Sequence, residues 1–124
     1  MHRSTSRIGA VLALCALALT AAVATASARR GTSRAPLTAR VLIRDISFAP
    51  HTVTIRRGGQ VTWSWRDGTA PNAISHTVTS TGRARFHGAD ARSSGDLKVR
   101  FPRAGYYRYL CTIHVGMSGL VVVR

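Results

Sequence analysis

The sequence predicts a single all-β domain, and three features of the 124-residue chain lead to this prediction. Apolar and polar residues alternate in many short runs, which is the pattern of strands with one buried face. Turn-forming residues separate these runs, and no run repeats its apolar residues at the 3.6-residue period of a helix. Many short strands joined by turns indicate a β-sandwich or a small barrel.

The first predicted strands follow a polar, basic stretch at residues 29–38, which we expect to be a flexible leader. In ARVLIRDISF, residues 39–48, the apolar residues change from one face to the other, which predicts a bulge or bend near Arg44 and Asp45. Three further runs predict strands: HTVTIR (51–56), VTWSW (61–65) and SHTVTS (75–80). Trp63, in the middle of the second of these runs, is expected in the core.

Residues 81–95 are rich in Gly and Arg and have little periodicity, so we expect a long connection there. Three more runs predict the remaining strands: DLKVRF (96–101), YYRYLC (106–111) and GLVVV (119–123). His51 and His87 lie in or beside predicted turns, without other metal-binding side chains next to them, so we expect both to be solvated. The predicted folded domain covers residues 39–124.

Residues 1–28 have the features of a secretory signal peptide. Arg3 and Arg7 precede an apolar, alanine-rich run, and Ala-Ser-Ala at residues 26–28 fits a cleavage site. The run is shorter than the roughly 20 apolar residues that a transmembrane helix needs. We therefore expect export to the periplasm or the cell exterior, and a mature chain at residues 29–124 without a stable membrane span.

The predicted mature chain is strongly basic. Sixteen basic and four acidic residues follow residue 28, which gives a net charge of +12. This excess favours acidic proteins or an anionic cell envelope as partners, although a solvated surface explains it equally well. We expect no nucleic acid partner, because the exported chain has no nucleic-acid-binding motif. One small domain leaves no room for a separate catalytic domain, so we expect no enzymatic activity. We also expect the protein to be a monomer.

The segment CTIHVGM, residues 111–117, carries the candidate chemistry. Cys15 would leave with the signal peptide, so Cys111 would be the single cysteine of the exported protein. Such a thiol pairs between chains, stays buried and inert, or binds a metal. Cys111 ends one predicted strand, and His114 and Met117 follow at three-residue intervals before the next, so a tight loop would direct all three at one centre. The same motif would also arise without a metal, if Cys111 and Met117 were core residues and His114 a surface residue of the loop.

A fourth side chain favours the metal site. His76 begins a predicted strand after a loop, and it could face the same end of the domain as the loop ligands. A thiolate, two imidazoles and a weak thioether are the ligands of a blue copper electron-transfer site, whereas a thioether is not a usual zinc ligand. We therefore predict one copper ion as the cofactor. The predicted ligands are His76, Cys111, His114 and Met117.

The chain resembles the cupredoxins of the plastocyanin, amicyanin and pseudoazurin type. The matching segments are FAPHTVTIRRGGQVTW (48–63), SHTV (75–78) and FPRAGYYRYLCTIHVGM (101–117). The resemblance implies a Greek-key β-sandwich of seven to eight strands, with a type 1 copper site at one end. It also implies that the four predicted ligands hold the copper. The His114 edge would then exchange single electrons with redox partner proteins, and the arginines of the chain favour partners with acidic docking surfaces.

The sequence departs from this family at Thr77, where Asn is common, and at Ile113 and Val115, where many members have proline within the ligand loop. These differences affect the hydrogen bonding around the thiolate and the stiffness of the loop. The sequence is also compatible with two other functions. A copper storage or delivery protein of the cell envelope would use the same four ligands, and a purely structural β-sandwich would use none of them.

Overall fold

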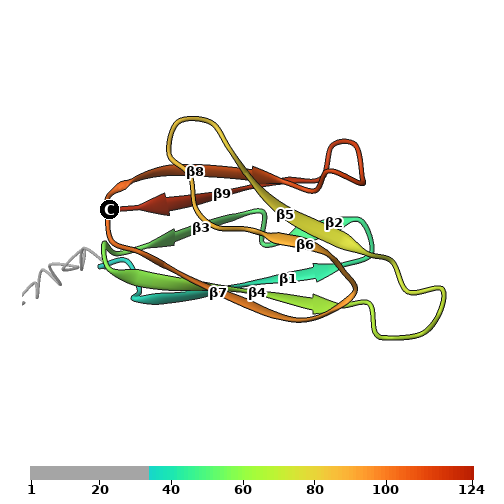
Figure 1. Cartoon of the computed structure of the whole chain (residues 1–124). Helices are drawn as coiled ribbons and strands as arrows, with labels where there is room; N and C mark the ends of the chain where they lie inside the picture. Colours follow the sequence, from blue (N-terminus) through green and yellow to red (C-terminus); the bar gives the residue numbers. More distant parts are fainter. Residues whose placement is uncertain (1–33) are drawn as a thin grey trace, which may run out of the picture. The chain divides into compact units, whose positions relative to one another are not determined.

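Two β-sheets form the part of the chain that the computed structural model describes, residues 34–124 (Figure 1). One sheet has the strand order β2-β1-β4-β7, and the other has the order β3-β9-β8-β5-β6. Residues 34–124 contain no helix, so the predicted all-β sandwich is confirmed, with nine strands in place of seven to eight. The strands are β1 (Thr38–Arg44), β2 (Ser47–Ala49), β3 (Thr52–Ile55), β4 (Gly59–Arg66), β5 (His76–Thr81), β6 (Ala89–Arg92), β7 (Ser94–Phe101), β8 (Gly105–Leu110) and β9 (Ser118–Val123).

The core of the sandwich is built around Trp63 of β4, as predicted. Its side chain is fully buried. The indole stacks on the ring of Phe86, with ring centroids 5.2 Å apart, and meets the edge of Tyr109 at 5.3 Å. Phe101 and Tyr107 continue this cluster, with their centroids 4.8 Å apart. Such offset and edge-to-face aromatic pairs add about 0.5–1.5 kcal/mol each beyond the burial of their area.

The expected bend near Arg44 and Asp45 is a full reversal of the chain. β2 returns antiparallel beside β1, and Arg44 pairs with Ser47 across a two-residue turn. Asp45 in this turn has a φ of 54°, a left-handed conformation that Asp tolerates better than most residues. The change of apolar face in the sequence marks this hairpin, because Ile43 of β1 and Phe48 of β2 pair with each other and are both buried.

The prediction of a long connection over residues 81–95 is wrong, because these residues include strand β6. β6 pairs antiparallel with β5 at the edge of the five-stranded sheet, with a register shift between His76 and Val78. None of its four residues is buried, so it has no alternation of apolar and polar residues that would reveal a strand. β7 also begins at Ser94, two residues before the predicted start.

The end of the predicted leader, residues 29–38, joins the fold. The carbonyl of Pro36 accepts a hydrogen bond of 2.9 Å from the N–H of Arg56. The carbonyl of Leu37 accepts one of 2.8 Å from the N–H of Gln60. The backbone is therefore fixed to the sandwich from Pro36 onward, before the first predicted strand residue.

The predicted signal peptide, residues 1–28, lies outside the described residues. Within residues 34–124, no helix is long and apolar enough to cross a membrane. His51 and His87 are both exposed, which confirms the expectation that they are solvated.

Strand β8 lies between β5 and β9 and runs antiparallel to both. Its pairing with β9 places the ring of Tyr109 against Gly119, its cross-strand partner. A Cβ atom added to Gly119 would collide with this ring, whose neighbours Trp63 and Phe48 leave it little room to move. Glycine at this position therefore allows the close approach that fills the core next to the loop at residues 111–117.

We predict that Gly119→Ala destabilises the metal-free domain by about 1–3 kcal/mol, because the added methyl group overpacks the core against Tyr109. Urea unfolding followed by tryptophan fluorescence measures this loss. The exposed neighbour Ser118 provides the control, since Ser118→Ala should change the unfolding free energy by less than about 0.5 kcal/mol. Equal stability of the two variants would show that the ring of Tyr109 moves aside freely.

Candidate metal centre

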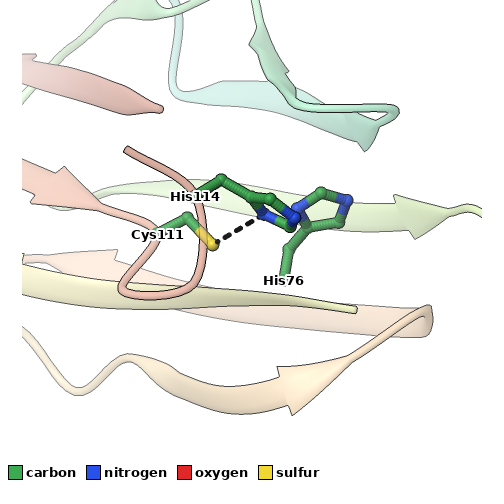
Figure 2. Close-up of side chains that lie close together, drawn as sticks. All are labelled: His76, Cys111 and His114. Atoms are coloured by element: carbon green, nitrogen blue, oxygen red, sulfur yellow. Dashed lines mark hydrogen bonds between the residues drawn. The ribbon is translucent and has the colours of Figure 1, made fainter. Parts of the chain in front are cut away.

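The antiparallel pairing of three strands brings the predicted ligands to one end of the sandwich. Because β8 runs against both neighbours, its end meets the beginnings of β5 and β9. His76 is the first residue of β5, Cys111 follows β8, and Met117 precedes β9. His114 lies on the loop between the last two, and Figure 2 shows its ring turned toward His76 and Cys111.

Three of the four predicted ligands form a compact cluster. One ligand atom each from His76, Cys111 and His114 lies within 4.8 Å of the other two. Sγ of Cys111 is 3.5 Å from Nδ1 of His114, and the centroids of the two imidazole rings are 4.8 Å apart. A thiolate and two imidazoles at these distances can bind copper or zinc.

Met117 lies beside this cluster at the base of the loop. Its carbonyl accepts a hydrogen bond of 2.9 Å from the N–H of Cys111, and its own N–H donates to the carbonyl of His114 at 3.3 Å. The Met117 side chain is 4 % exposed and lines one surface hollow together with Cys111 and His114. The loop therefore closes on itself and holds Met117 beside Cys111.

Burial differs among the four side chains. His76 is fully buried, Cys111 is almost fully buried, and His114 is half-buried. Next to His114, the side chains of Ile113 and Val115 are exposed. Nδ1 of His76 is buried and has no hydrogen-bond partner, which is costly for a polar atom unless another ligand uses its lone pair. A metal ion bound at the cluster would satisfy this atom.

The thiol of Cys111 is prepared for metal binding by its surroundings. Burial raises its pKa, but hydrogen bonds from the backbone of Thr77, Ile113 and His114, together with the His114 side chain, outweigh burial and lower the pKa to about 6. The N–H of Thr77 lies 3.4 Å from Sγ. The group is therefore a thiolate, the form that binds metals, at neutral pH.

A hydroxyl network ties the ligand loop to β5. Oγ1 of Thr77 accepts a hydrogen bond of 2.8 Å from the N–H of Thr112 and lies 3.1 Å from the hydroxyl of the same residue. The hydroxyl of Thr79 donates to Oγ1 of Thr77 at 3.2 Å. Thr77 thus connects the residue after His76 to the residue after Cys111, so the two halves of the cluster cannot move independently.

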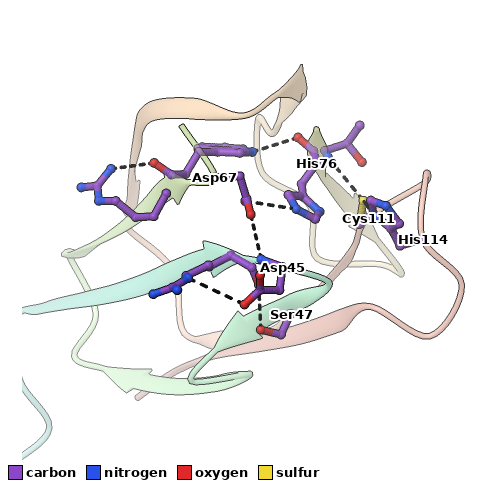
Figure 3. Close-up of polar contacts among 10 residues, drawn as sticks. Asp45, Ser47, Asp67, His76, Cys111 and His114 are labelled. Carbon is purple, nitrogen blue, oxygen red and sulfur yellow. Dashed lines mark hydrogen bonds and ion pairs between the residues drawn. The ribbon is translucent and has the colours of Figure 1, made fainter. Parts of the chain in front are cut away.

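Two contacts of His76 involve residues that sequence reasoning did not assign to the site. Nε1 of Trp65 donates to the His76 carbonyl at 2.9 Å. Nε2 of His76 lies 3.3 Å from Oδ2 of Asp67, and the side chains are 0 % and 6 % exposed (Figure 3). Asp67 directly follows β4, and a rare acidic residue at a strand end is a weak sequence signal that could have identified it.

Comparisons with known proteins agree with this geometry. Residues 37–124 match the family model described as copper binding proteins, plastocyanin/azurin family. Amicyanin-alpha of Methylorubrum extorquens is 35% identical over 117 residues, covering 90% of this chain and 93% of the relative. A reduced amicyanin mutant superposes with a TM-score of 0.58 at 28% identity, covering 70% of this chain and 82% of the other. A purple cupredoxin from Nitrosopumilus maritimus superposes with a TM-score of 0.57 at 22% identity, covering 69% of this chain and 99% of the other.

We predict that Thr77→Val lowers the unfolding free energy of the metal-free domain by about 1 kcal/mol, because the N–H of Thr112 loses its acceptor. The amide hydrogen of Thr112 should also exchange faster with solvent. Thr79→Val is the matched control, since the Thr79 hydroxyl is a donor to Thr77 and does not contact the loop. Equal losses in the two variants would contradict a specific role of Thr77 in holding the loop.

Proposed function

The chain belongs to the plastocyanin/azurin family of copper-binding proteins, and we propose that it is an exported carrier of single electrons. In this proposal His76, Cys111, His114 and Met117 bind one copper ion. The observation that carries the proposal is the cluster of one thiol and two imidazoles within 4.8 Å, with a buried methionine at the base of the same loop.

When bound, the copper ion supplies a one-electron couple between Cu(II) and Cu(I). The chain's own residues keep the site from rearranging. The hydrogen bond from the N–H of Cys111 to the carbonyl of Met117 closes the loop, and the hydrogen bond from the N–H of Thr112 to Thr77 fixes the loop to β5. Because His76 and Cys111 are buried, water has little access to the site. A rigid and dry site lowers the reorganisation that accompanies electron transfer.

His114 is the proposed electron port. It is half-buried, unlike the other three proposed ligands, and the exposed side chains of Ile113 and Val115 flank it. These side chains would form a small apolar docking patch for a redox partner. Arg108 and Gly116 line the same groove, and the proposed exported chain has 16 basic and 4 acidic residues, a net charge of +12. An acidic partner would therefore be attracted, and its association rate would fall as salt concentration rises.

The remaining parts of the proposal concern the whole chain. Residues 1–28 would direct the protein out of the cytoplasm and be removed, since their sequence has the three regions of a signal peptide. The exported domain would act as a monomer and would catalyse no reaction of its own. The amicyanin match, which spans nearly the whole of both chains, supports a small carrier of this type.

We predict that the domain treated with Cu(II) develops the intense colour of a thiolate-to-copper charge-transfer transition, with the corresponding EPR spectrum. Cys111→Ser should abolish the colour because the serine hydroxyl cannot replace the thiolate. Met117→Leu should keep the colour and raise the reduction potential, because loss of a weak donor favours Cu(I). A colourless wild-type protein that binds no copper by metal analysis would refute the proposed site.

An electron carrier passes on an electron and keeps its copper ion, whereas a copper delivery protein passes on the ion itself. We predict reversible voltammetry of the copper-loaded domain and rapid electron self-exchange, which slows when Val115→Glu places negative charge on the exposed patch. The matched control is Ala104→Glu, in the exposed turn between β7 and β8 at the end of β8 remote from Cys111. Irreversible voltammetry combined with rapid copper transfer to a metal-free acceptor would instead assign the chain to copper delivery.

A further inference from the structure

Asp67 differs from the three other acidic residues of the chain in its burial. Its side chain is 6 % exposed, whereas those of Asp45 and Asp96 are 81% and 35% exposed and Asp90 lies on the exposed strand β6. A buried carboxylate is costly unless hydrogen bonds satisfy its oxygen atoms. The partners of Asp67 should therefore explain why an acid occupies this position.

Each oxygen of Asp67 faces one group. Oδ1 accepts a hydrogen bond of 2.8 Å from the backbone N–H of Asp45, in the turn between β1 and β2. Oδ2 lies 3.3 Å from Nε2 of His76 in an ion-pair contact, and neither of these two buried atoms has a hydrogen-bond partner. Figure 3 shows the carboxylate between the turn and the imidazole.

The position of Asp67 is fixed from outside the metal cluster. Its backbone N–H donates to the carbonyl of Ser93 at 3.2 Å, between β6 and β7. Asp45, with its positive φ, holds the carboxylate from the hairpin turn. The carboxylate is thus oriented by two segments that contain no proposed ligand, so it can act on His76 before any metal binds.

We propose that Asp67 is a positioning residue, whose buried carboxylate accepts the hydrogen of His76 Nε2 and so leaves Nδ1 as the nitrogen that binds the metal. A neutral imidazole carries a hydrogen on one nitrogen and a lone pair on the other. Nε2 facing a carboxylate carries the hydrogen, and the lone pair then lies on Nδ1, which is buried without a partner. Carboxylates in this position orient histidine ligands and strengthen their donor atoms in many metal sites.

The chemistry requires a carboxylate rather than an amide. Two donors, the N–H of Asp45 and Nε2–H of His76, approach the two oxygens of Asp67 from different sides. An asparagine has one oxygen and would turn its NH₂ group toward one of these donors. Even with its oxygen toward His76, a neutral acceptor binds an N–H more weakly than a charged one does. Both orientations of the amide therefore weaken the hold on His76.

The inference rests on the copper site proposed above, and its test uses two readouts. Cu(I) affinity is measured by competition with a chromophoric chelator, and the hydrogen on the His76 ring is located by ¹⁵N–¹H NMR of the metal-free protein. We expect Asp67→Ala and Asp67→Asn to lower Cu(I) affinity about 10–100-fold. In Asp67→Ala, the His76 ring should lose its single Nε2-protonated form.

Asp90→Asn is the matched control, because it removes the same charge from the exposed strand β6. It should leave the Cu(I) affinity within about twofold of the wild-type value. An equal loss in Asp90→Asn would attribute the effect to net charge and overturn the inference. Wild-type Cu(I) affinity in both Asp67→Ala and Asp67→Asn would also overturn the inference. If Asp67→Ala does not fold, the isosteric Asp67→Asn decides the outcome by its affinity alone.

The NMR readout separates this inference from the proposed function. Wild-type protein that binds no copper would refute the copper site, while the position of the hydrogen on His76 would still report on the contact with Asp67. An Nδ1-protonated His76 in metal-free wild-type protein would overturn the positioning role, even if the copper-loaded protein carries electrons.

Discussion

The pairing of β8 with both β5 and β9 is the constraint on which the metal centre depends. The antiparallel register places the end of β8 beside the starts of both neighbours, so Cys111 meets His76 on one side and Met117 on the other. Tyr109 and Cys111 lie on the same face of the chain, and both are buried. A one-residue slip of β8 would turn both outward. The aromatic core therefore fixes the position of the thiol, and the site cannot form without it.

The sequence was informative where local pattern determines structure. Alternation predicted most of the strands, and the loop from Cys111 to Met117 could be recognised because three candidate ligands follow one another closely. β6 was missed because an exposed edge strand needs no apolar face. Asp67 was missed for a different reason. Its contact with His76 depends on the path of the loop after β4, which no periodicity describes.

Thr77 contacts the site through both its backbone and its side chain, and the two contacts depend on the sequence differently. The donor to the Cys111 sulfur is the backbone N–H of Thr77, so this contact does not depend on which side chain follows His76. The connection to the ligand loop does depend on the side chain, since it passes through Oγ1. A hydroxyl at this position can therefore replace the asparagine that is common in related proteins, while the hydrogen bond to the thiolate remains.

The unequal burial of the four side chains also has a kinetic consequence. His76, Cys111 and Met117 are buried, whereas His114, which lines the same surface hollow as Cys111 and Met117, is half-buried. The shortest route for an ion to or from the cluster would pass His114 and Val115, which line this hollow. The proposed docking patch covers the same route. A bound redox partner would then slow copper exchange, so the protein would lose its metal most readily while it diffuses between partners.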